Sequence, residues 1–452
     1  MTVSGAGGGK IGPGLSSFAD HPKEVADYIR PLFKHASDLV PVEDYADTRV
    51  FIKSTAGMRM LAAETQQAIY DEIYNALADD PLFPFPLDRS HLGTIDGDME
   101  AFYAVLSANY LEGRIDARLH PTGHTYGEIG ALDMGGASTQ IIFRHEKEQP
   151  EQTDDGEACQ PSCFYEEALG ARGVAATAPV SPDDFWGVSH LGYGVAEVRL
   201  RIWDYLVEDH LSEGHAGDSV VNPCTFANRI DPWKGHNLVG TGDHFACEEA
   251  VAAVLWQGEQ ALTGDRRCGA GVDGVCGIGG VSMPAPSGDF LAMSVFFYAM
   301  HCLHKLGPAE LTSWPSPSLN ELRDAAEGFC AMDWEALIQR EADTTRAGLA
   351  ALSSPSEGLA HRCVEVVYMT TLLRDGYGFP ENARNVTFAL ETAGMELEWT
   401  LGYALFELAQ GMTSSSTAVI SDADAQEGGG ETMAEESSCS PRGTNVSRTR
   451  DG

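Results

Sequence analysis

The sequence has few basic residues for its length. Its 452 residues include 29 Lys and Arg against 67 Asp and Glu, which gives a formal net charge of −38 at pH 7. A surface this acidic repels phosphate backbones, so we expect neither nucleic acid nor an anionic membrane as a partner. If the substrate is itself an anion, a divalent cation is the obvious group to offset the surrounding negative charge locally.

Long apolar runs and a leader are also missing. Although 43% of the residues are hydrophobic, no run approaches the roughly 18 apolar residues that a membrane-spanning helix needs. The start, MTVSGAGGGKIGPG, lacks the charged-then-apolar order of a signal peptide and is typical of a flexible linker. We therefore expect no membrane anchor in this chain, and a globular protein large enough to form two lobes.

No CxxC pair occurs among the ten cysteines, so a zinc site built from two such pairs is the less favoured interpretation. Two pairs flank short loops, Cys159 with Cys163 and Cys268 with Cys276. Disulfides of a secreted or lumenal protein explain this spacing better. Glycosylation sequons at Asn385 and Asn445 add a little, because such sequons are often fortuitous. We expect a protein of the secretory pathway, in the Golgi or ER lumen or outside the cell.

Hydrophobic periodicity predicts alternating strands and helices, and hence an α/β fold. The strand RVFIKST (49–55) leads into a helix over 58–78, and a helical stripe runs over 99–112. The runs EIGALDM and TQIIFR are joined by GGAS, which predicts an antiparallel hairpin. Further helices are expected near 195–208, 248–262, 320–340, 359–374 and 395–410, and residues from Thr413 onward are expected to be disordered.

The hairpin segment ALDMGGASTQII (131–142) has the composition of a phosphate loop. Gly135 and Gly136 can adopt positive φ and let backbone N–H groups converge on an anion. Ser138 and Gln140 can hold a water, and Asp133 can accept a hydrogen bond from a metal-bound water. The alternative is an ordinary hairpin turn, in which Gly-Gly is common.

Two further segments suggest hydrolysis. STAGMR (54–59) places small residues between a strand and a positively polarised helix N-terminus, although a plain helix start with Thr55 as its cap is the alternative. In DGDMEAFYAVLSANYL (96–111), Glu100 lies at the beginning of a helix, where acids are common for structural reasons alone. Beside two phosphate-type loops, Glu100 becomes a candidate base for an attacking water.

These three segments, in this order, resemble the apyrases, the family of nucleoside triphosphate diphosphohydrolases. Further segments resemble the family collinearly from about Pro13 to Gln410: HLGYGVAEVR, NPC, GTGDHFAC, SGDFLAMSVFFY, FCAMDW, YMTTLLRDGYGF and EWTLGYAL. The resemblance implies the two-lobed fold of actin and Hsp70, with a mixed, ribonuclease-H-like sheet in each lobe and substrate between the lobes. The implied first lobe is 1–97 plus 394–412, the second is 98–393, and 413–452 is a disordered acidic tail.

The resemblance also implies site residues. Glu100 would deprotonate the attacking water, which Ser138 and Gln140 would position. Water would attack the terminal phosphorus in line, without a phosphoenzyme, while Mg²⁺ or Ca²⁺ neutralises the leaving group. Asp133 and Thr55 would contact that cation through water. The implied phosphate-binding residues are Thr55, Ala56, Gly57, Gly135, Gly136, Ala137, Ser138 and Thr139.

Tyr298 and the remaining cysteines complete the implied assignments. Tyr298 matches a position where an aromatic ring stacks on the nucleobase, and the alternative is a core aromatic of an apolar helix. By analogy the disulfides are Cys224–Cys247, Cys268–Cys276 and Cys330–Cys363. Cys159 with Cys163 is a further candidate pair, and Cys302 and Cys439 stay unassigned.

The chain departs from the family at its start, where no DAGSS-like phosphate loop is found. We therefore expect the first lobe to lack its first hairpin and half of a phosphate clamp. One hypothesis is an apyrase whose true start lies upstream. Another is a truncated, catalytically inactive member that binds nucleotide weakly or acts as an interaction protein. A third is a relative of the exopolyphosphatases, against which STAGMR, NYL and the cysteine pattern count.

Overall fold

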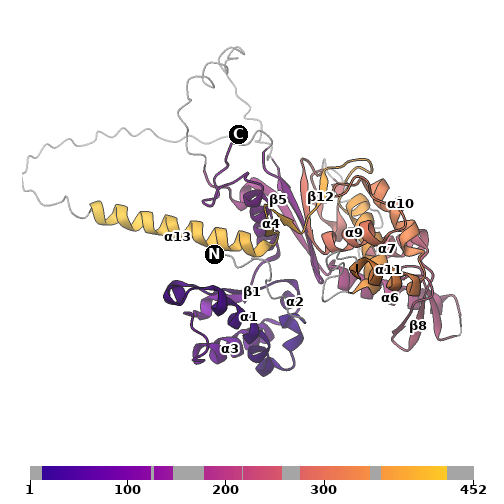
Figure 1. The fold of residues 1–452 in the computed structure, drawn as a ribbon, viewed down its shortest axis with the longest axis horizontal. Coiled ribbons are helices and arrows are strands. Elements are labelled where there is room, and N and C mark those ends of the chain that lie inside the picture. The colour runs from indigo at the N-terminus through magenta and orange to yellow at the C-terminus, as the bar shows by residue number, and fades with distance from the viewer. Residues whose placement is uncertain are drawn as a thin grey trace, which may run out of the picture. The chain divides into compact units, whose positions relative to one another are not determined.

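The computed structural model describes residues 13–123, 127–145, 178–215, 217–256, 275–346 and 358–424 (Figure 1). The chain forms two compact units, Met1–Glu407 and Leu408–Gly452. The last helix, α13 (Trp399–Asp424), begins in the first unit and ends in the second. Every other element named below belongs to the first unit.

The first part of the described chain is mainly helical and has its own apolar cluster. Ile69, Ile73 and Leu77 recur at every fourth residue and are all buried, as the spacing predicts for an amphipathic helix. The helix predicted over 58–78 is interrupted, because Ala62 has a ψ of 147° and cannot continue a helix. The elements are α1 (Val25–Leu39), β1 (Ile52–Ser54), α2 (Ala56–Arg59), α3 (Ala63–Ala78) and β2 (Leu92–Thr94). Strands β1 and β2 pair in parallel.

A five-stranded mixed sheet forms the centre of the second part, in the order β12-β11-β3-β4-β5. The predicted hairpin is confirmed, because β3 and β4 pair antiparallel with Met134 opposite Thr139. Strand β4 also pairs antiparallel with β5, whereas β3, β11 and β12 run parallel. The strands are β3 (Gly130–Met134), β4 (Ser138–Arg144), β5 (Phe185–Leu191), β11 (Phe290–Ser294) and β12 (Val386–Phe388).

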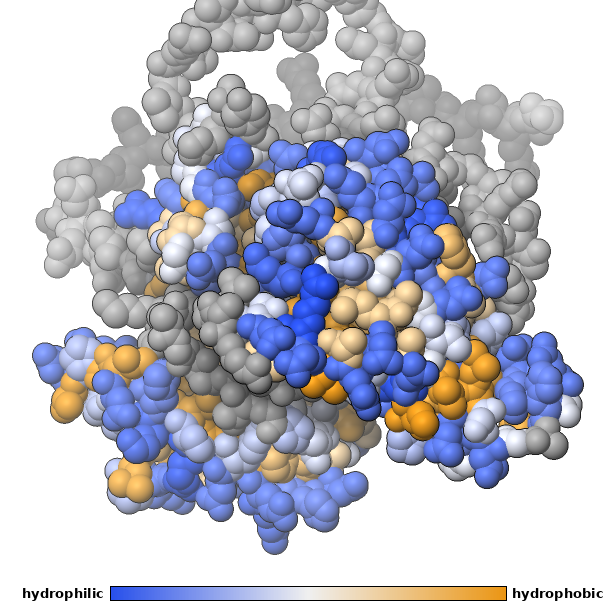
Figure 2. Space-filling model, turned by 45° about the vertical axis from the view of Figure 1, so that its right-hand side comes forward, coloured by the Kyte–Doolittle hydropathy of each residue, from blue (hydrophilic) through white to orange (hydrophobic). Residues whose placement is uncertain are grey.

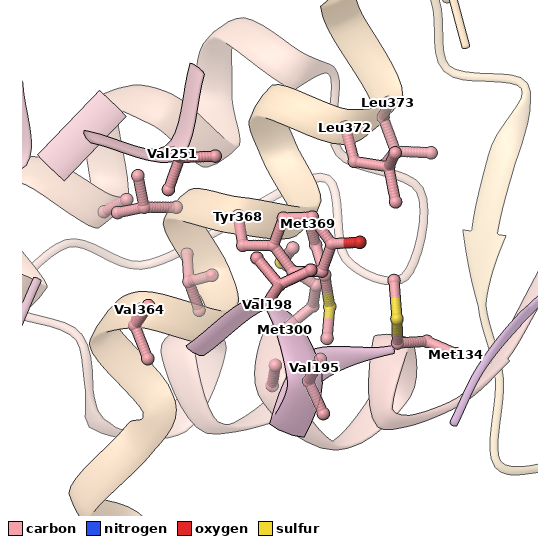
Figure 3. Packing of buried hydrophobic residues seen from close by; sticks show 14 of the residues in the cluster. Met134, Val195, Val198, Val251, Met300, Val364, Tyr368, Met369, Leu372 and Leu373 are labelled. Atoms are coloured by element: carbon pink, nitrogen blue, oxygen red, sulfur yellow. The ribbon is translucent and has the colours of Figure 1, made fainter. Parts of the chain in front are cut away.

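The two faces of this sheet have opposite character. Because side chains alternate along a strand, the register partners Asp133, Gln140 and Ser189 share one face, which helix α4 (Gly97–Leu111) covers. Ile141 and Phe143 lie on the other face and join the main apolar cluster. Figure 3 shows that cluster from close by, with Met134 beside side chains of several helices.

The remaining helices surround that apolar cluster, and among the described residues three small sheets besides the β1–β2 pair lie outside the central one. The helices are α6 (Val195–Ser212), α7 (His244–Leu255), α9 (Val295–Leu306), α10 (Leu319–Cys330), α11 (Trp334–Arg346) and α12 (Arg362–Thr371), which a π-helical turn (Leu372–Gly376) continues. The small strands are β6 (Ser219–Asn222), β7 (Ile230–Trp233), β8 (His236–Gly240), β9 (Val275–Cys276), β10 (Ser282–Met283), β13 (Glu391–Thr392) and β14 (Met395–Glu396). Short 3-10 helices span Leu15–Phe18, Pro22–Glu24, Val42–Asp47, Arg89–His91, Pro182–Asp184, Ile278–Gly280 and Leu359–His361.

Besides the interruption at Ala62, three helices differ from the prediction. The helix expected near 248–262 is α7, which begins at His244 and ends at Leu255, and residues 257–262 lie outside the described residues. The helix expected over 320–340 is two helices, α10 and α11, because the Asp333 carboxylate accepts hydrogen bonds from the backbone N–H groups of Glu335 and Ala336 and so starts a new helix. At the C-terminal end, α13 continues beyond Thr413, to Asp424. The predicted lobe boundaries stay a prediction.

The cysteines agree with the implied pairing where the structure describes them. Cys224 is bonded to Cys247 and Cys330 to Cys363, and all four are buried. Cys302 is a buried free thiol. Residues Cys159, Cys163, Cys268 and Cys439 lie outside the described residues, so the Cys268–Cys276 pair is not tested.

The surface reflects the acidic composition. Figure 2 shows a face that is mostly hydrophilic, with apolar residues in small separate groups. Exposed large apolar residues include Leu82, Val221 and Ile230. In the part of the chain that is described, no helix combines the length and apolar character needed to span a membrane.

Candidate active site

The start of α4 positions Glu100 in the interior of the protein. The Asp96 carboxylate accepts a hydrogen bond from the Asp98 N–H at 2.9 Å and so caps the helix. Glu100 follows in the first turn, but it points into the protein and is only 5% exposed. A carboxylate this buried needs hydrogen-bond partners.

Arg59 and Gln140 supply those partners. Glu100 Oε2 accepts hydrogen bonds from Arg59 Nη2 at 2.8 Å and from Gln140 Nε2 at 3.2 Å. Arg59 Nη2 also donates to Ser138 Oγ at 3.2 Å, and its Nη1 donates to the Ile95 carbonyl at 3.1 Å. The guanidinium therefore joins α2, α4 and β4 at one point.

The hydrogen-bond directions leave two groups available for a ligand. The two N–H hydrogens of Gln140 Nε2 are shared among three acceptors, which are Ser138 Oγ at 2.7 Å, Ser189 Oγ at 2.9 Å and Glu100 Oε2 at 3.2 Å. The amide carbonyl of Gln140 therefore faces the opposite side, where it can accept from a water. Ser138 Oγ accepts from both Arg59 and Gln140, so its own O–H is left to donate outward.

The environment gives Glu100 the proton affinity of a base that works near neutral pH. The pKa of Glu100 is raised to about 7, chiefly by burial and also by the negative charge of Asp133, while Arg59 opposes both effects. Asp133 is itself 5% exposed and lies in the same row of the sheet as Gln140. A pKa close to the working pH is what general-base catalysis requires.

The hairpin loop between β3 and β4 is supported from behind by α6. Gly135 N–H donates to the Ser138 carbonyl at 2.9 Å, while Val195 N–H donates to the Gly135 carbonyl at 3.0 Å and Ala196 N–H to the Gly136 carbonyl at 2.9 Å. Among the described residues, the N–H groups of Gly136 and Ala137 donate to no backbone carbonyl. Two neighbouring free amides of this kind can bind phosphate oxygens.

The glycine requirement lies elsewhere than the sequence predicts. Neither Gly135 nor Gly136 has φ in the left-handed region, so the loop does not use the positive φ that glycine permits. The support from α6 explains this, because it fixes the loop carbonyls without a left-handed residue. Glycine is required instead at Gly194, where a Cβ atom would lie 2.3 Å from Ala137 N.

The segment STAGMR reaches the site through its last residue. Thr55 makes no side-chain cap hydrogen bond to α2, so the plain capping interpretation is not supported. Its carbonyl instead accepts from the N–H groups of Met58 and Arg59. Ala56 is buried, and a Cβ on Gly57 would lie 2.8 Å from Ser16 Oγ. The contact of this segment with Glu100 is made by Arg59.

Thr139 and Tyr298 are the two remaining site residues that the sequence predicts. Thr139 is on the core face of β4, where its hydroxyl meets the Asp133 carbonyl at 2.9 Å and the Tyr377 hydroxyl at 3.2 Å. Tyr298 is half-buried on α9, with its ring centroid 5.8 Å from that of Phe297. Base stacking by Tyr298 and phosphate binding by Thr139 stay predictions.

The acidic residues fit a cation held through water. Among the described residues, no group of three or more His, Cys, Asp or Glu side chains could hold a metal ion directly. Mg²⁺ bound with substrate phosphates needs only one or two carboxylates. Asp133 and Glu100 repel each other, as the raised pKa of Glu100 reflects, and a cation beside them would relieve this repulsion.

Two residues of this group are not predicted from the sequence. Arg59 ends the segment STAGMR, so its position was a usable signal, but its partner is 41 residues away. Ser189 directly precedes the segment HLGYGVAEVR and contacts Gln140 across 49 residues. Only the pairing of β5 with β4 shows that Ser189 faces the site.

Comparison with known proteins identifies the family. The model of the GDA1/CD39 (nucleoside phosphatase) family matches residues 8–420. Ectonucleoside triphosphate diphosphohydrolase 7 of Mus musculus is 28% identical over 420 residues, and ectonucleoside triphosphate diphosphohydrolase 4 of Homo sapiens is 27% identical over 430 residues. Each alignment covers 88% of this chain and 65% of the relative, so the chain spans less than two thirds of the length of these relatives.

A solved structure supports the fold. The nucleoside triphosphate hydrolase of Neospora caninum matches with a TM-score of 0.54 at 16% sequence identity, over 86% of this chain and 78% of that chain. This likeness and the mixed central sheet confirm the predicted class, an α/β fold of the actin and Hsp70 type. With the family model matching nearly the whole sequence, the chain belongs to the GDA1/CD39 (nucleoside phosphatase) family.

Proposed function

We propose that this chain hydrolyses the terminal phosphoanhydride bond of nucleoside triphosphates, diphosphates or both, by direct attack of water. The observation that carries the proposal is the buried Glu100 carboxylate, which has a pKa of about 7 and is hydrogen-bonded to Gln140 beside Ser138. Family membership and the activities for which the similar proteins are named support it.

Each residue has a defined part in the proposed reaction. Glu100 accepts the proton of the attacking water, and the Gln140 carbonyl accepts the water's other hydrogen, which leaves a lone pair free to attack phosphorus. The outward O–H of Ser138 donates to the water or to the terminal phosphate. The free N–H groups of Gly136 and Ala137 bind terminal phosphate oxygens. No side-chain nucleophile takes part.

A divalent cation, Mg²⁺ or Ca²⁺, is the proposed cofactor, and when bound it would neutralise charge that develops on the leaving phosphate group. Asp133 would hold it through a water, and Thr55 is the second proposed contact. Ala56, Gly57 and Gly135 are proposed to line the phosphate path. Tyr298 is proposed to stack on the base.

The two buried disulfides support an oxidising compartment as the working place of the chain, in the secretory pathway or outside the cell. Mass spectrometry of protein from its native source, alkylated without reduction, tests this part. Disulfide-linked peptides containing Cys224 and Cys330 support the proposal, and free thiols at both positions would rule it out.

Phosphate release from several nucleotides, with Mg²⁺ or Ca²⁺, tests the reaction. Glu100→Gln keeps the size and hydrogen-bonding capacity of the side chain but removes the base, so we expect kcat to fall by about 10²- to 10⁴-fold. Glu64→Gln, in the exposed first turn of α3, is the matched control and keeps full activity.

The outcomes separate the alternatives. Full activity of Glu100→Gln would refute the base assignment. If the wild-type chain binds a non-hydrolysable nucleotide but releases no phosphate, it is an inactive, nucleotide-binding member. Release of phosphate from inorganic polyphosphate, but not from nucleotides, would place its chemistry with the exopolyphosphatases.

A further inference from the structure

The neighbouring strand β5 supplies a further hydrogen-bond acceptor to the Gln140 side chain. Asp133, Gln140 and Ser189 are register partners on β3, β4 and β5 and therefore form one row on the face that α4 covers. Directly opposite residues of an antiparallel pair lie close enough for their side chains to interact. Here the Ser189 hydroxyl accepts a hydrogen bond from Gln140 Nε2 at 2.9 Å.

Ser189 is fixed in turn by the start of α4. Strand β5 is at the edge of the described sheet, so one side of its backbone has no strand partner there. The Asp98 carboxylate accepts a hydrogen bond from the Ser189 N–H at 3.1 Å. Asp98 lies in the same helical turn as Glu100, so the base and the neighbour of Gln140 are held by one element.

Gly97 allows this close approach. A Cβ atom at Gly97 would lie 2.6 Å from both Cβ and Oγ of Ser189, and 3.6 Å from Arg59 Cζ. Any larger residue would have to displace the Ser189 side chain. The first turn of α4 therefore lies directly against the Ser189 side chain.

We propose that Ser189 is a positioning residue of the hydrolytic site, whose hydroxyl fixes the plane of the Gln140 amide so that the amide carbonyl faces the attacking water. This inference rests on the proposed function. Ser138 and Glu100, the other acceptors of Gln140 Nε2, are themselves groups of the proposed reaction. Ser189 has no part in the proposed reaction, so its hydrogen bond acts on the orientation of the Gln140 amide alone.

Ser189→Ala removes that restraint and leaves the other contacts of Gln140 in place. We expect kcat to fall by about 10- to 100-fold, because a small misplacement of a reacting group costs rate on this scale. KM should change less than about twofold, because the phosphate-binding amides are untouched. Ser189→Thr, which keeps the hydroxyl, should retain most of the activity.

Coupling to Gln140 separates positioning from a general structural role. If Ser189 acts through Gln140, then adding Ser189→Ala to Gln140→Ala causes no further loss of kcat. Gly97→Ala, which pushes on the Ser189 side chain from α4, should lower kcat in the same way. Ser212→Ala, which removes a hydroxyl from the last turn of α6, is the control and leaves kcat unchanged.

The results distinguish the two proposals. Wild-type kcat in Ser189→Ala, or a loss that adds fully to that of Gln140→Ala, would overturn the role of Ser189 while leaving the proposed hydrolysis intact. A wild-type chain that hydrolyses no nucleotide overturns both. Melting temperatures measured for every variant show whether a loss of activity reflects unfolding instead, in which case Ser189→Thr decides: low activity in that folded variant also counts against the role.

Discussion

The two faces of the β3–β4–β5 sheet are both buried, yet one is a polar network and the other an apolar core. On the α4 side, Gln140 and Ser189 are linked by a hydrogen bond, whereas one residue away Ile141 is fully buried among apolar side chains. A shift of register by one residue would exchange the two faces. The register of the hairpin is thus specified by both faces, because one requires polar side chains and the other apolar ones. Buried polar groups are tolerated where each has a hydrogen-bond partner.

The largest expected effect tests the core face. Ile141→Ala deletes a fully buried side chain from the main apolar cluster and should lower the free energy of unfolding by about 2–5 kcal/mol. Urea denaturation measures this. The pH dependence of the remaining activity should match that of the wild type, because Ile141 does not face Glu100. A shifted pH profile would show that the two faces are not independent.

The second-largest expected effect tests whether packing at the start of α6 controls the position of the loop amides. Gly194→Val places a side chain against the backbone of Gly136 and Ala137, so the loop must move. We expect a loss of about 10²- to 10³-fold in kcat, the usual cost of misplacing a backbone donor to a developing charge. Phosphate release measures it. Gly217→Ala, where a Cβ atom meets nothing within 4 Å, is the control.

The smallest of the three effects concerns the polar face alone. Arg59 lowers the pKa of Glu100, so Arg59→Gln should raise that pKa above about 7. The base acts when deprotonated, so activity rises with pH through this pKa, and the acidic limb of the kcat/KM profile should move to higher pH by roughly one unit or more. Arg89→Gln, which removes an ion pair with Asp71 of α3, is the control and should leave the profile unchanged. An unmoved acidic limb in Arg59→Gln would show that Arg59 does not tune Glu100.

The sequence predicts the hairpin and the fold class because both depend on local patterns. Strand-like apolar runs flank GGAS, and Glu100 lies in the first turn of a strongly apolar helix. The structure brings Glu100, Ser138 and Gln140 into contact, while their roles stay proposals. Arg59 and Ser189 escape prediction because their contacts depend on how α2 and β5 are placed, which no local pattern specifies.

The positive φ that Gly135 and Gly136 permit is not used in the structure, for a related physical reason. A Gly-Gly turn allows positive φ, but the carbonyls of Gly135 and Gly136 are fixed by N–H groups at the start of α6. Contacts between segments far apart in the sequence thus override the local preference. The residue that sequence reasoning leaves unexplained, Gly194, is the one whose side chain has no room.

The contact between α13 and α4 bears on how far the chain can be shortened. A Cβ atom at Gly402 would lie 1.9 Å from the Tyr103 carbonyl, and the Gly402 N–H donates to Ser107 Oγ at 2.7 Å. The rings of Tyr403 and Phe406 lie against Tyr103, with centroids 5.2 and 5.6 Å away. Removal of the residues from 399 onward would strip this cover from the helix that carries the proposed base. C-terminal truncations should therefore be tolerated only as far as about residue 407, although the proposed catalytic residues lie much earlier in the sequence.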